Sequence, residues 1–204
     1  MLKSPVRIAV LVSGGGTNLQ ALLDAQKAGK IPDGQIVLVL SNNPDAYALQ
    51  RAKQNGVKAV CVDKKRYPDF SNREKEMRRV LKEEGIELIV LAGYLSILSE
   101  EFTKEYAGRM INIHPSLIPS FCGKGFYGLK VHEAALSYGV KVTGATVHFV
   151  NEIPDGGQIV MQKAVKIRKG DTPEQLQKRV MEQAEWKILP KATQTVCKLL
   201  RKSK

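Results

Sequence analysis

The sequence predicts an α/β fold: a doubly wound, mostly parallel sheet with a C-terminal antiparallel hairpin. Two observations predict it. Short runs rich in Val, Ile and Leu are apolar at nearly every position, which is typical of strands buried on both faces of a parallel sheet. Segments with helical spacing separate these runs. The expected parallel strands are residues 6–12, 35–41, 58–62, 88–92 and 110–114.

The expected helices alternate with these strands. Leucines within residues 19–23 repeat at helical spacing before Gly29, which is suited to end the first helix. Residues 46–55 and 73–84 are the next two expected helices, and a glycine directly follows each of them. Regular alternation of strand and helix predicts crossover connections, and therefore parallel pairing.

The pattern changes after residue 114. Pro115 and Pro119 prevent the strand from continuing and do not allow a long helix to begin. Residues 121–128 then form a glycine-rich loop that we expect to be flexible. A helix is expected over 131–138, because Gly139 follows it as a stop signal.

The last third of the chain predicts a hairpin and a further helix. Strands over 142–150 and 158–166 flank residues 151–157, which form a long connection. Thr172 and Pro173 are suited to cap and begin the last helix. Because no linker or repeat interrupts the chain, we expect a single domain over residues 1–204.

Composition limits the class of protein. Of 204 residues, 43% are hydrophobic and 25% are charged, which is enough apolar mass for a core. The 32 Lys and Arg exceed the 20 Asp and Glu, and the formal net charge of +12 favours anionic partners. Charge alone leaves open whether such a partner is a small phosphate or a nucleic acid.

The cysteines and the N-terminal segment bear on the compartment. Cys61, Cys122 and Cys197 are far apart and lack metal-ligand spacing, so we expect reduced thiols in the cytoplasm, with no zinc site and no disulfide framework. Lys3 and Arg7 stand close to the apolar residues 8–12, but that run is too short for a signal peptide. We also expect no membrane span, because no apolar run approaches the necessary length.

A glycine-rich turn at residues 13–18 follows the first strand and opens a helix. Glycines allow a ligand to approach the backbone, and a helix start offers free N–H groups to a phosphate. A dinucleotide fingerprint would need a glycine where Leu19 stands and an acidic residue after the second strand, and both are missing. A Walker loop would need a lysine here. A monophosphate site that uses Thr17 and Asn18 is therefore favoured, and a plain helix-capping turn stays open as the alternative.

The strand end at 112–114 carries the strongest chemical signal. Alternation along a strand places Asn112 and His114 on one side, at the carboxyl edge where α/β sheets bind ligands. An amide donor beside an imidazole suits a developing oxyanion. Asp155 lies in a Pro-Asp-Gly-Gly segment, where an aspartate can serve the turn alone. If the fold instead places its carboxylate beside His114, we expect the negative charge to raise the pKa of the imidazole.

These residues predict acyl transfer without a covalent nucleophile, since no Ser or Cys stands in a nucleophile-elbow motif. A lone histidine is more often structural than catalytic. We therefore expect structural roles for His132, in the helix over 131–138, and for His148, in the strand over 142–150.

The motifs together resemble a known family. Ser-Gly-Gly-Gly-Thr-Asn-Leu-Gln at 13–20, Leu-Ala-Gly-Tyr-Leu-Ser-Ile-Leu at 91–98, Asn-Ile-His-Pro-Ser-Leu-Ile-Pro at 112–119, Gly-Ala-Thr-Val-His-Phe-Val at 144–150 and Asp-Gly-Gly at 155–157 carry the resemblance. They are similar to the phosphoribosylglycinamide formyltransferases (glycinamide ribonucleotide transformylases), folate-dependent formyltransferases of purine synthesis. The resemblance extends from about residue 6 to about residue 195.

The resemblance implies a Rossmann-like formyltransferase fold and transfer of a formyl group from 10-formyltetrahydrofolate to the amine of glycinamide ribonucleotide, without a metal. It implies the catalytic residues Asn112, His114 and Asp155, with His114 as proton donor. Gly16, Thr17, Asn18 and Glu185 are implied to bind the ribonucleotide. Arg73, Leu95, Ser96, Ile97, Leu98 and Asn112 are implied to contact the folate, and residues 151–155 to close over the pterin.

The chain departs from the family pattern in several places. Leu95-Ser96 stands where Met-Arg is common, and Trp186 stands where histidine is common. The loop over 121–128 is longer and richer in glycine, and the stretch before Glu185 needs a one-residue gap to align.

Three other functions agree less well with the sequence. Methionyl-tRNA formyltransferases share the Asn-Ile-His-Pro core but add a C-terminal RNA-binding domain, and formyltetrahydrofolate deformylases add an N-terminal domain, so the length of 204 residues favours neither. A basic nucleic-acid-binding protein is suggested by Lys187, Lys191, Lys198, Arg201, Lys202 and Lys204. No RNA-binding or helix-turn-helix signature accompanies these charges, so we expect no nucleic-acid partner. The oligomeric state is left open.

Overall fold

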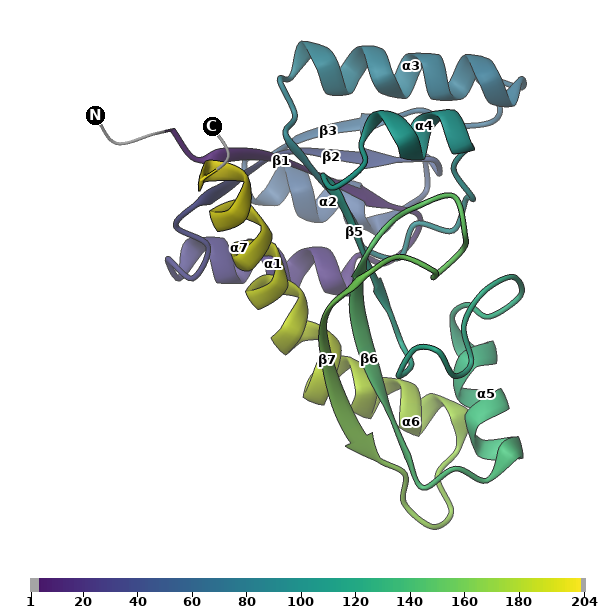
Figure 1. Ribbon diagram of the computed structural model, residues 1–204. Helices are drawn as coiled ribbons and strands as arrows, with labels where there is room; N and C mark the ends of the chain where they lie inside the picture. Colours follow the sequence, from purple (N-terminus) through teal and green to yellow (C-terminus); the bar gives the residue numbers. More distant parts are fainter. Residues whose placement is uncertain (1–3, 203–204) are drawn as a thin grey trace.

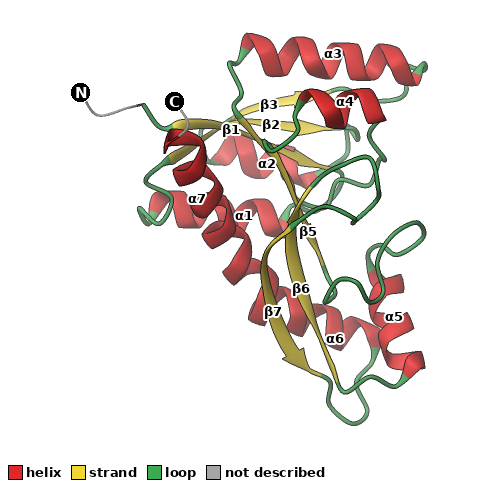
Figure 2. Ribbon diagram, viewed as in Figure 1, coloured by secondary structure: helices red, strands yellow, loops and turns green. Residues whose placement is uncertain are grey.

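A computed structural model describes residues 4–202 and shows one seven-stranded sheet with helices on both faces (Figures 1 and 2). The strand order is β3-β2-β1-β4-β5-β6-β7. The strands are β1 Val6–Val12, β2 Gly34–Ser41, β3 Lys58–Cys61, β4 Leu88–Leu91, β5 Met110–His114, β6 Val142–Phe149 and β7 Ile159–Lys166. Lys3, beside the N-terminal apolar run, and Lys204, among the C-terminal basic residues, lie outside the described residues.

The pairing of the strands confirms the predicted fold class. β1 pairs in parallel with β2 and β4, β2 with β3, and β4 with β5. The pairs β5–β6 and β6–β7 are antiparallel, so the expected hairpin extends the sheet past β5. Apolar side chains fill both faces of β1 because helices cover both faces of this part of the sheet.

The helices are α1 Thr17–Lys27, α2 Tyr47–Gln54, α3 Phe70–Glu83, α4 Glu100–Glu105, α5 Leu129–Tyr138, α6 Pro173–Val180 and α7 Trp186–Lys202. One apolar cluster joins α1, α2, α6 and α7 to the first face of the sheet. A second cluster joins α3 and α4 to the opposite face, where Met77 and Phe102 pack against β4 and β5. These six helices therefore bury their apolar side chains against the sheet.

Helix boundaries differ from the expectation where a side chain caps the helix. The α3 helix begins at Phe70 rather than at residue 73, because the Asp69 side chain accepts a hydrogen bond from the Asn72 N–H. Ser99 caps α4 in the same way, and this short helix was not predicted. Thr172 forms a capping box with Gln175 ahead of Pro173, as expected.

A π turn, Met181–Glu185, separates α6 from α7 and was not predicted. The expected last helix therefore continues from Pro173 to Lys202 as α6, the π turn and α7. Among residues 4–202, no helix is both long enough and apolar enough to cross a membrane.

The topology places the carboxyl ends of β1, β4 and β5 at one edge of the sheet. The chain leaves β1 toward β2 on one side and returns from β3 to β4 on the other, so strand order reverses between β1 and β4. Open α/β sheets bind ligands in the crevice outside such a reversal. The turn at 13–18, the segment at 91–98 and the strand end at 112–114 all lie at this edge.

Candidate active site

Two adjoining cavities lie at this edge of the sheet. The larger, of about 560 Å³, is lined by residues from both ends of the expected site, among them Asn18, Leu95, Ser96, Ile97, Asn112, His114, Asp155 and Glu185. The smaller, of about 130 Å³, is lined by Leu98, His148 and the loop at 151–155. Both cavities share Asn112 and Asp155 in their walls, so the expected catalytic residues stand where the two spaces meet.

The first turn has the backbone shape that the sequence suggested. Gly16 lies at the N-terminal cap of α1 with a φ of 72°, a conformation that favours glycine. A Cβ atom at this position would lie 2.7 Å from the Cβ of Ala48. No side chain among residues 4–202 caps this end of α1, so the first N–H groups of the helix lack a capping partner there, beside Thr17 and Asn18. This is the geometry of an anion site.

Asn18 links this turn to the π turn. Its Nδ2 donates a hydrogen bond of 2.6 Å to Oε2 of Glu185, across 167 positions of the chain. Glu185 is buried, and burial raises the pKa of its carboxyl to about 7, although the hydrogen bond from Asn18 opposes the shift. Two residues expected to bind one ligand are thus in direct contact.

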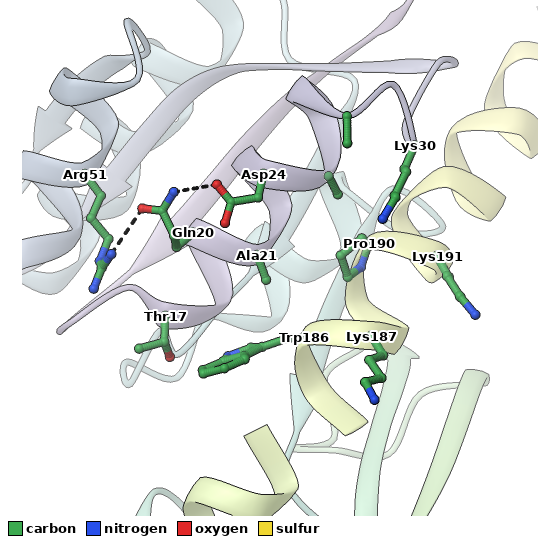
Figure 3. A pocket seen from close by; sticks show the side chains of 12 residues that line it. Thr17, Gln20, Ala21, Asp24, Lys30, Arg51, Trp186, Lys187, Pro190 and Lys191 are labelled. Carbon is green, nitrogen blue, oxygen red and sulfur yellow. Dashed lines mark hydrogen bonds between the residues drawn. The ribbon is translucent and has the colours of Figure 1, made fainter. Parts of the chain in front are cut away.

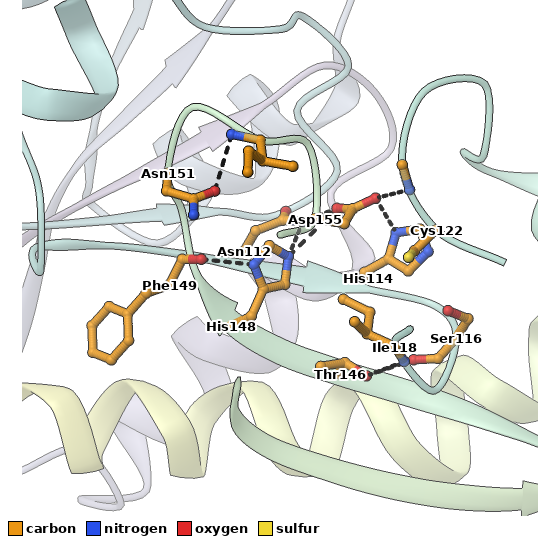
Figure 4. A network of polar contacts seen from close by, with 12 residues as sticks. Asn112, His114, Ser116, Ile118, Cys122, Thr146, His148, Phe149, Asn151 and Asp155 are labelled. Carbon is orange, nitrogen blue, oxygen red and sulfur yellow. Dashed lines mark hydrogen bonds and ion pairs between the residues drawn. The ribbon is translucent and has the colours of Figure 1, made fainter. Parts of the chain in front are cut away.

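Asp155 is the centre of the polar network in Figure 4. One carboxylate oxygen lies 3.5 Å from Nδ1 of His114 and accepts a 2.8 Å hydrogen bond from the Gly123 backbone N–H. The other oxygen lies 3.5 Å from Nδ2 of Asn112. The structure therefore brings Asn112, His114 and Asp155 together.

His148 also belongs to this network, although the sequence analysis expected a structural role for it. Its Nε2 lies 3.5 Å from Oδ1 of Asp155 and 3.2 Å from Nδ2 of Asn112. Strand register explains the contact, because Asn112 and His148 are opposite each other in the antiparallel pair β5–β6. The sequence would have predicted this contact only if the pairing of β6 with β5 had been known, because that pairing sets the register.

Backbone carbonyls fix the tautomers of both histidines. Nε2 of His114 lies 2.9 Å from the carbonyl of Phe121, and Nδ1 of His148 lies 2.8 Å from the carbonyl of Phe149. A carbonyl oxygen only accepts, so each of these nitrogens carries a hydrogen. The remaining nitrogens, Nδ1 of His114 and Nε2 of His148, both face Asp155. A proton added to either ring therefore forms a charge-assisted pair with the carboxylate.

Burial decides the pKa of His114. We expected Asp155 to raise this pKa, and the carboxylate does act in that direction. Burial of the imidazole is the larger effect, however, and it lowers the pKa of His114 below its ordinary value. Burial acts to raise the pKa of Asp155, but the interactions with His148 and His114 together hold it below its ordinary value.

Two residues at the site have an unusual backbone. Phe121 has a φ of 50° and Asp155 a φ of 57°, although neither is glycine. Such conformations cost free energy and often occur at functional sites. Phe121 begins the glycine-rich loop. Two hydrogen bonds hold the first half of this loop: the Phe121 carbonyl accepts from His114, and the Gly123 N–H donates to Asp155. The loop expected to be flexible is therefore tied to the network at two points.

The segment at 94–98 presents apolar side chains to solvent at the mouth of the cavities. Leu95 and Ile97 are each 64% exposed, and Ile153 in the facing loop is 58% exposed. Exposed apolar groups around a cavity are typical of a site for an apolar or aromatic ligand. The Leu95 N–H donates a 2.9 Å hydrogen bond to Oγ of Ser13, which ties this segment to the end of β1.

Glu74 of α3 supports the same segment and was missed by the sequence analysis. Its carboxylate is buried and accepts hydrogen bonds from the N–H and the hydroxyl of Ser99. Arg73, its neighbour, was expected to contact folate. Its guanidinium instead donates to the carbonyls of Tyr67 and Pro68, and Arg73 lines neither cavity.

His132 is buried in the wall of the larger cavity. Neither of its ring nitrogens has a hydrogen-bond partner among the described residues. Burial, with a smaller contribution from His114, lowers the pKa of His132 to about 4, so the ring is neutral at physiological pH.

Comparison with known proteins places this site in a family. The family described as formyl transferase matches residues 6–193, which is most of the chain. The chain belongs to the formyl transferase family. The match includes both cavities and the network around Asp155.

Individual members of the formyl transferase family are similar over most of the chain. A chloroplastic phosphoribosylglycinamide formyltransferase of Arabidopsis thaliana is 38% identical over 94% of this chain, and a trifunctional purine biosynthetic protein adenosine-3 of Gallus gallus is 44% identical over 94%. The chain spans 65% of the length of the former and 18% of the latter. It is thus shorter than both relatives.

Solved structures agree with the formyl transferase fold. A glycinamide ribonucleotide transformylase from Symbiobacterium toebii superposes with a TM-score of 0.88 at 40% identity, covering 95% of this chain and 88% of that one. A formyltetrahydrofolate deformylase from Pseudomonas putida superposes with a TM-score of 0.81 at 30% identity, covering 93% and 64%. Within residues 4–202, no group of three or more His, Cys, Asp or Glu residues could hold a metal ion.

Proposed function

We propose that this formyl transferase moves a formyl group from 10-formyltetrahydrofolate to the amine of glycinamide ribonucleotide, in the cytoplasm, as a step of purine synthesis. One observation carries the proposal. Asn112, His114 and Asp155 meet where a cavity beside an anion-binding turn joins a cavity rimmed by apolar side chains. The named relatives in purine biosynthesis support the same substrates.

The ribonucleotide is assigned to the side of the larger cavity that faces α1. Gly16, Thr17 and Asn18 offer backbone N–H groups and polar side chains to its phosphate. Glu185, next to Asn18, is placed to accept hydrogen bonds from hydroxyl or amine groups of the same ligand. The phosphate end of the acceptor is then held at the start of α1, and its other polar groups are held by the π turn. The Asn18–Glu185 hydrogen bond joins these two elements.

The folate is assigned to the apolar side. Leu95, Ser96, Ile97 and Leu98 form one wall, and residues 151–155 form the facing wall. Ile97 and Ile153 supply exposed apolar surface to a planar ring system. Arg73 lies outside both cavities, so its contact to the folate is proposed only for the part of the ligand that extends into solvent.

Catalysis is assigned to Asn112 and His114. As the amine attacks the formyl carbon, negative charge develops on the formyl oxygen, and donors aimed at this charge lower the barrier by a few kcal/mol each. The Nε2–H of His114 now bonds to the carbonyl of Phe121. A formyl oxygen is an acceptor of the same kind, so it can replace that carbonyl without a change of tautomer.

Asp155 is assigned to the charge balance of the reaction. The attacking nitrogen must lose a proton, and the departing folate nitrogen must gain one. Burial lowers the pKa of His114, but the Asp155 carboxylate opposes this shift and stabilises the imidazolium when it forms, so that the imidazole can take the proton from the attacking amine and pass it to the departing folate nitrogen. Holding both substrates beside this pair removes much of the entropic barrier.

The test is an assay of the purified chain with glycinamide ribonucleotide and 10-formyltetrahydrofolate. We expect formylated ribonucleotide and deformylated folate in equal amounts, and a loss of more than about a hundredfold in kcat for His114→Ala. Near-normal turnover of that variant would contradict the assignment.

The likeness to a deformylase favours one second candidate, hydrolysis of the same folate. The two functions differ in their need for an acceptor. Release of deformylated folate at an equal rate with and without the ribonucleotide would identify a hydrolase and would overturn the transferase proposal.

A further inference from the structure

A groove of about 750 Å³ lies outside the two cavities, between α1 and α7 (Figure 3). On the α1 side, Ala21, Ala25 and Ala28 give the groove an apolar floor, beside the polar side chains of Thr17, Gln20 and Asp24. Its α7 wall is made of Trp186 and Pro190. The groove is therefore apolar inside and large enough for a ligand of ordinary cofactor size.

Cationic side chains surround this apolar floor. Lys30, Lys187 and Lys191 are spread along one side of the groove, and Arg51 lies on the other side (Figure 3). The single carboxylate in the lining, Asp24, already accepts a 2.8 Å hydrogen bond from Gln20. Formal charge in the lining is thus strongly positive.

Only one of these cations is committed to the protein. Arg51 donates to the carbonyl of Gly15 at 2.8 Å and to the Gln20 side chain at 3.1 Å. Within residues 4–202, no ion pair joins Lys30, Lys187 or Lys191 to a carboxylate. The three lysines are therefore free to pair with negative charges of a ligand.

Trp186 gives the groove a planar surface. The indole is half-buried, and its Nε1–H has no hydrogen-bond partner among the described residues. Aromatic side chains stack with planar rings, and an indole can stack with any nucleobase because every base has a planar face. The groove thus offers a stacking surface in the middle and unpaired ammonium groups along one side.

We propose that this groove binds a nucleoside polyphosphate, with the base on Trp186 and the phosphates at Lys30, Lys187 and Lys191. A free anion would leave the apolar floor unused, and an apolar ligand would leave the lysines unpaired; a nucleotide uses both. Thr17 lines the groove and also belongs to the turn assigned to the acceptor phosphate. Bound nucleotide should therefore raise the KM for the acceptor, a consequence that rests on the proposed function.

Trp186 is the only tryptophan of the chain, so its fluorescence reports on the groove directly. The experiment titrates the whole chain with ATP at constant ionic strength, by fluorescence and by calorimetry. We expect saturable quenching at one site. The double variant Lys187→Gln/Lys191→Gln should bind ATP about tenfold more weakly, because it loses two charge-assisted contacts.

The matched control is Lys141→Gln/Lys163→Gln, which removes the same charge from exposed positions outside the groove. We expect the control to bind ATP as the unaltered chain does, and thermal denaturation to show that both variants fold. Equal affinity in all three proteins, or no saturable binding, would overturn the proposal. So would inorganic triphosphate that binds as tightly as ATP, or a short single-stranded RNA that binds tenfold more tightly. These binding measurements require no turnover, so their outcome is independent of the proposed reaction.

Discussion

Asn18 and Glu185 form a buried hydrogen bond of 2.6 Å that joins the start of α1 to the π turn near the end of the chain. The bond brings together the turn assigned to the acceptor phosphate and a carboxyl whose pKa burial raises to about 7. The acceptor side of the cavity therefore depends on contacts between the two ends of the fold.

The first prediction concerns the pH dependence of stability. The pKa of Glu185 is raised from 4.5 to about 7 in the folded state. The contribution of the protonated carboxyl to stability is therefore fully present below about pH 4.5, and it is lost as the pH rises to about 7. Relative to Glu185→Gln, the unaltered chain should lose on the order of 3 kcal/mol of unfolding free energy across this window. Urea denaturation of both proteins from pH 5 to pH 8 measures the difference. A difference that does not change with pH would contradict the prediction.

The second prediction concerns Asp155. Asp155→Asn keeps the size of the side chain but removes the charge that faces Nδ1 of His114. We expect kcat to fall by about a hundredfold or more, because protonated His114 loses its partner. Calorimetry should show that binding of the ribonucleotide is nearly unchanged, since Asp155 lies away from the turn at 13–18. A variant within threefold of normal turnover would show that the carboxylate has no catalytic role.

The third prediction tests whether His148 acts through Asp155. His148→Gln removes the ring nitrogen that lies 3.5 Å from the Asp155 carboxylate. We expect kcat to fall by about tenfold or more, with little change in KM for the ribonucleotide.

Combining His148→Gln with Asp155→Asn should add little to the loss caused by Asp155→Asn alone, because residues of one network are not additive. A purely structural histidine would give additive losses, together with a lower melting temperature. Measuring kcat for the two single variants and the double variant distinguishes these outcomes.

The fourth prediction compares two glycines at the ends of α1. Gly16 and Gly29 both have a positive φ, at 72° and 67°. An added Cβ at Gly16 would meet Ala48 at 2.7 Å, whereas one at Gly29 would meet nothing within 4 Å.

Gly29→Ala should therefore lower the free energy of unfolding by about 1 kcal/mol, which is the cost of a positive φ for alanine. Gly16→Ala should lower it by roughly twice as much or more, because the clash with Ala48 is added. Gly16→Ala should also raise the KM for the ribonucleotide, because the turn beneath its phosphate shifts. Chemical denaturation and steady-state kinetics test both effects. Equal destabilisation by the two substitutions would show that the contact with Ala48 is relieved at no cost.

Much of the fold was predictable because its signals are local. The strands that pair in parallel are apolar at nearly every position, and the helix after Thr172 begins with the expected cap. The Asn112-His114 pair was predictable from strand alternation, and Asp155 from the resemblance. That residues 1–204 form one domain, and that each expected site residue acts as assigned, stay predictions.

The missed features depend on contacts between distant segments. His148 alternates along β6 like any buried strand residue, and only the pairing of β6 with β5 places it opposite Asn112. Glu74 lies in a polar helix, where nothing local shows that its carboxylate is buried against Ser99. The pKa of His114 was expected in the wrong direction, because burial depends on the packed structure.

The π turn at Met181–Glu185 has a consequence for both binding surfaces of this protein. A π turn holds one residue more than an α turn, and each helical residue advances by about 100° around the axis. The extra residue of the π turn therefore affects the rotational phase of α7 relative to α6, and in this phase Glu185 lines the cavity and Trp186 lines the groove. Removing one residue from the turn would rotate the carboxyl away from the cavity and the indole away from the groove at once.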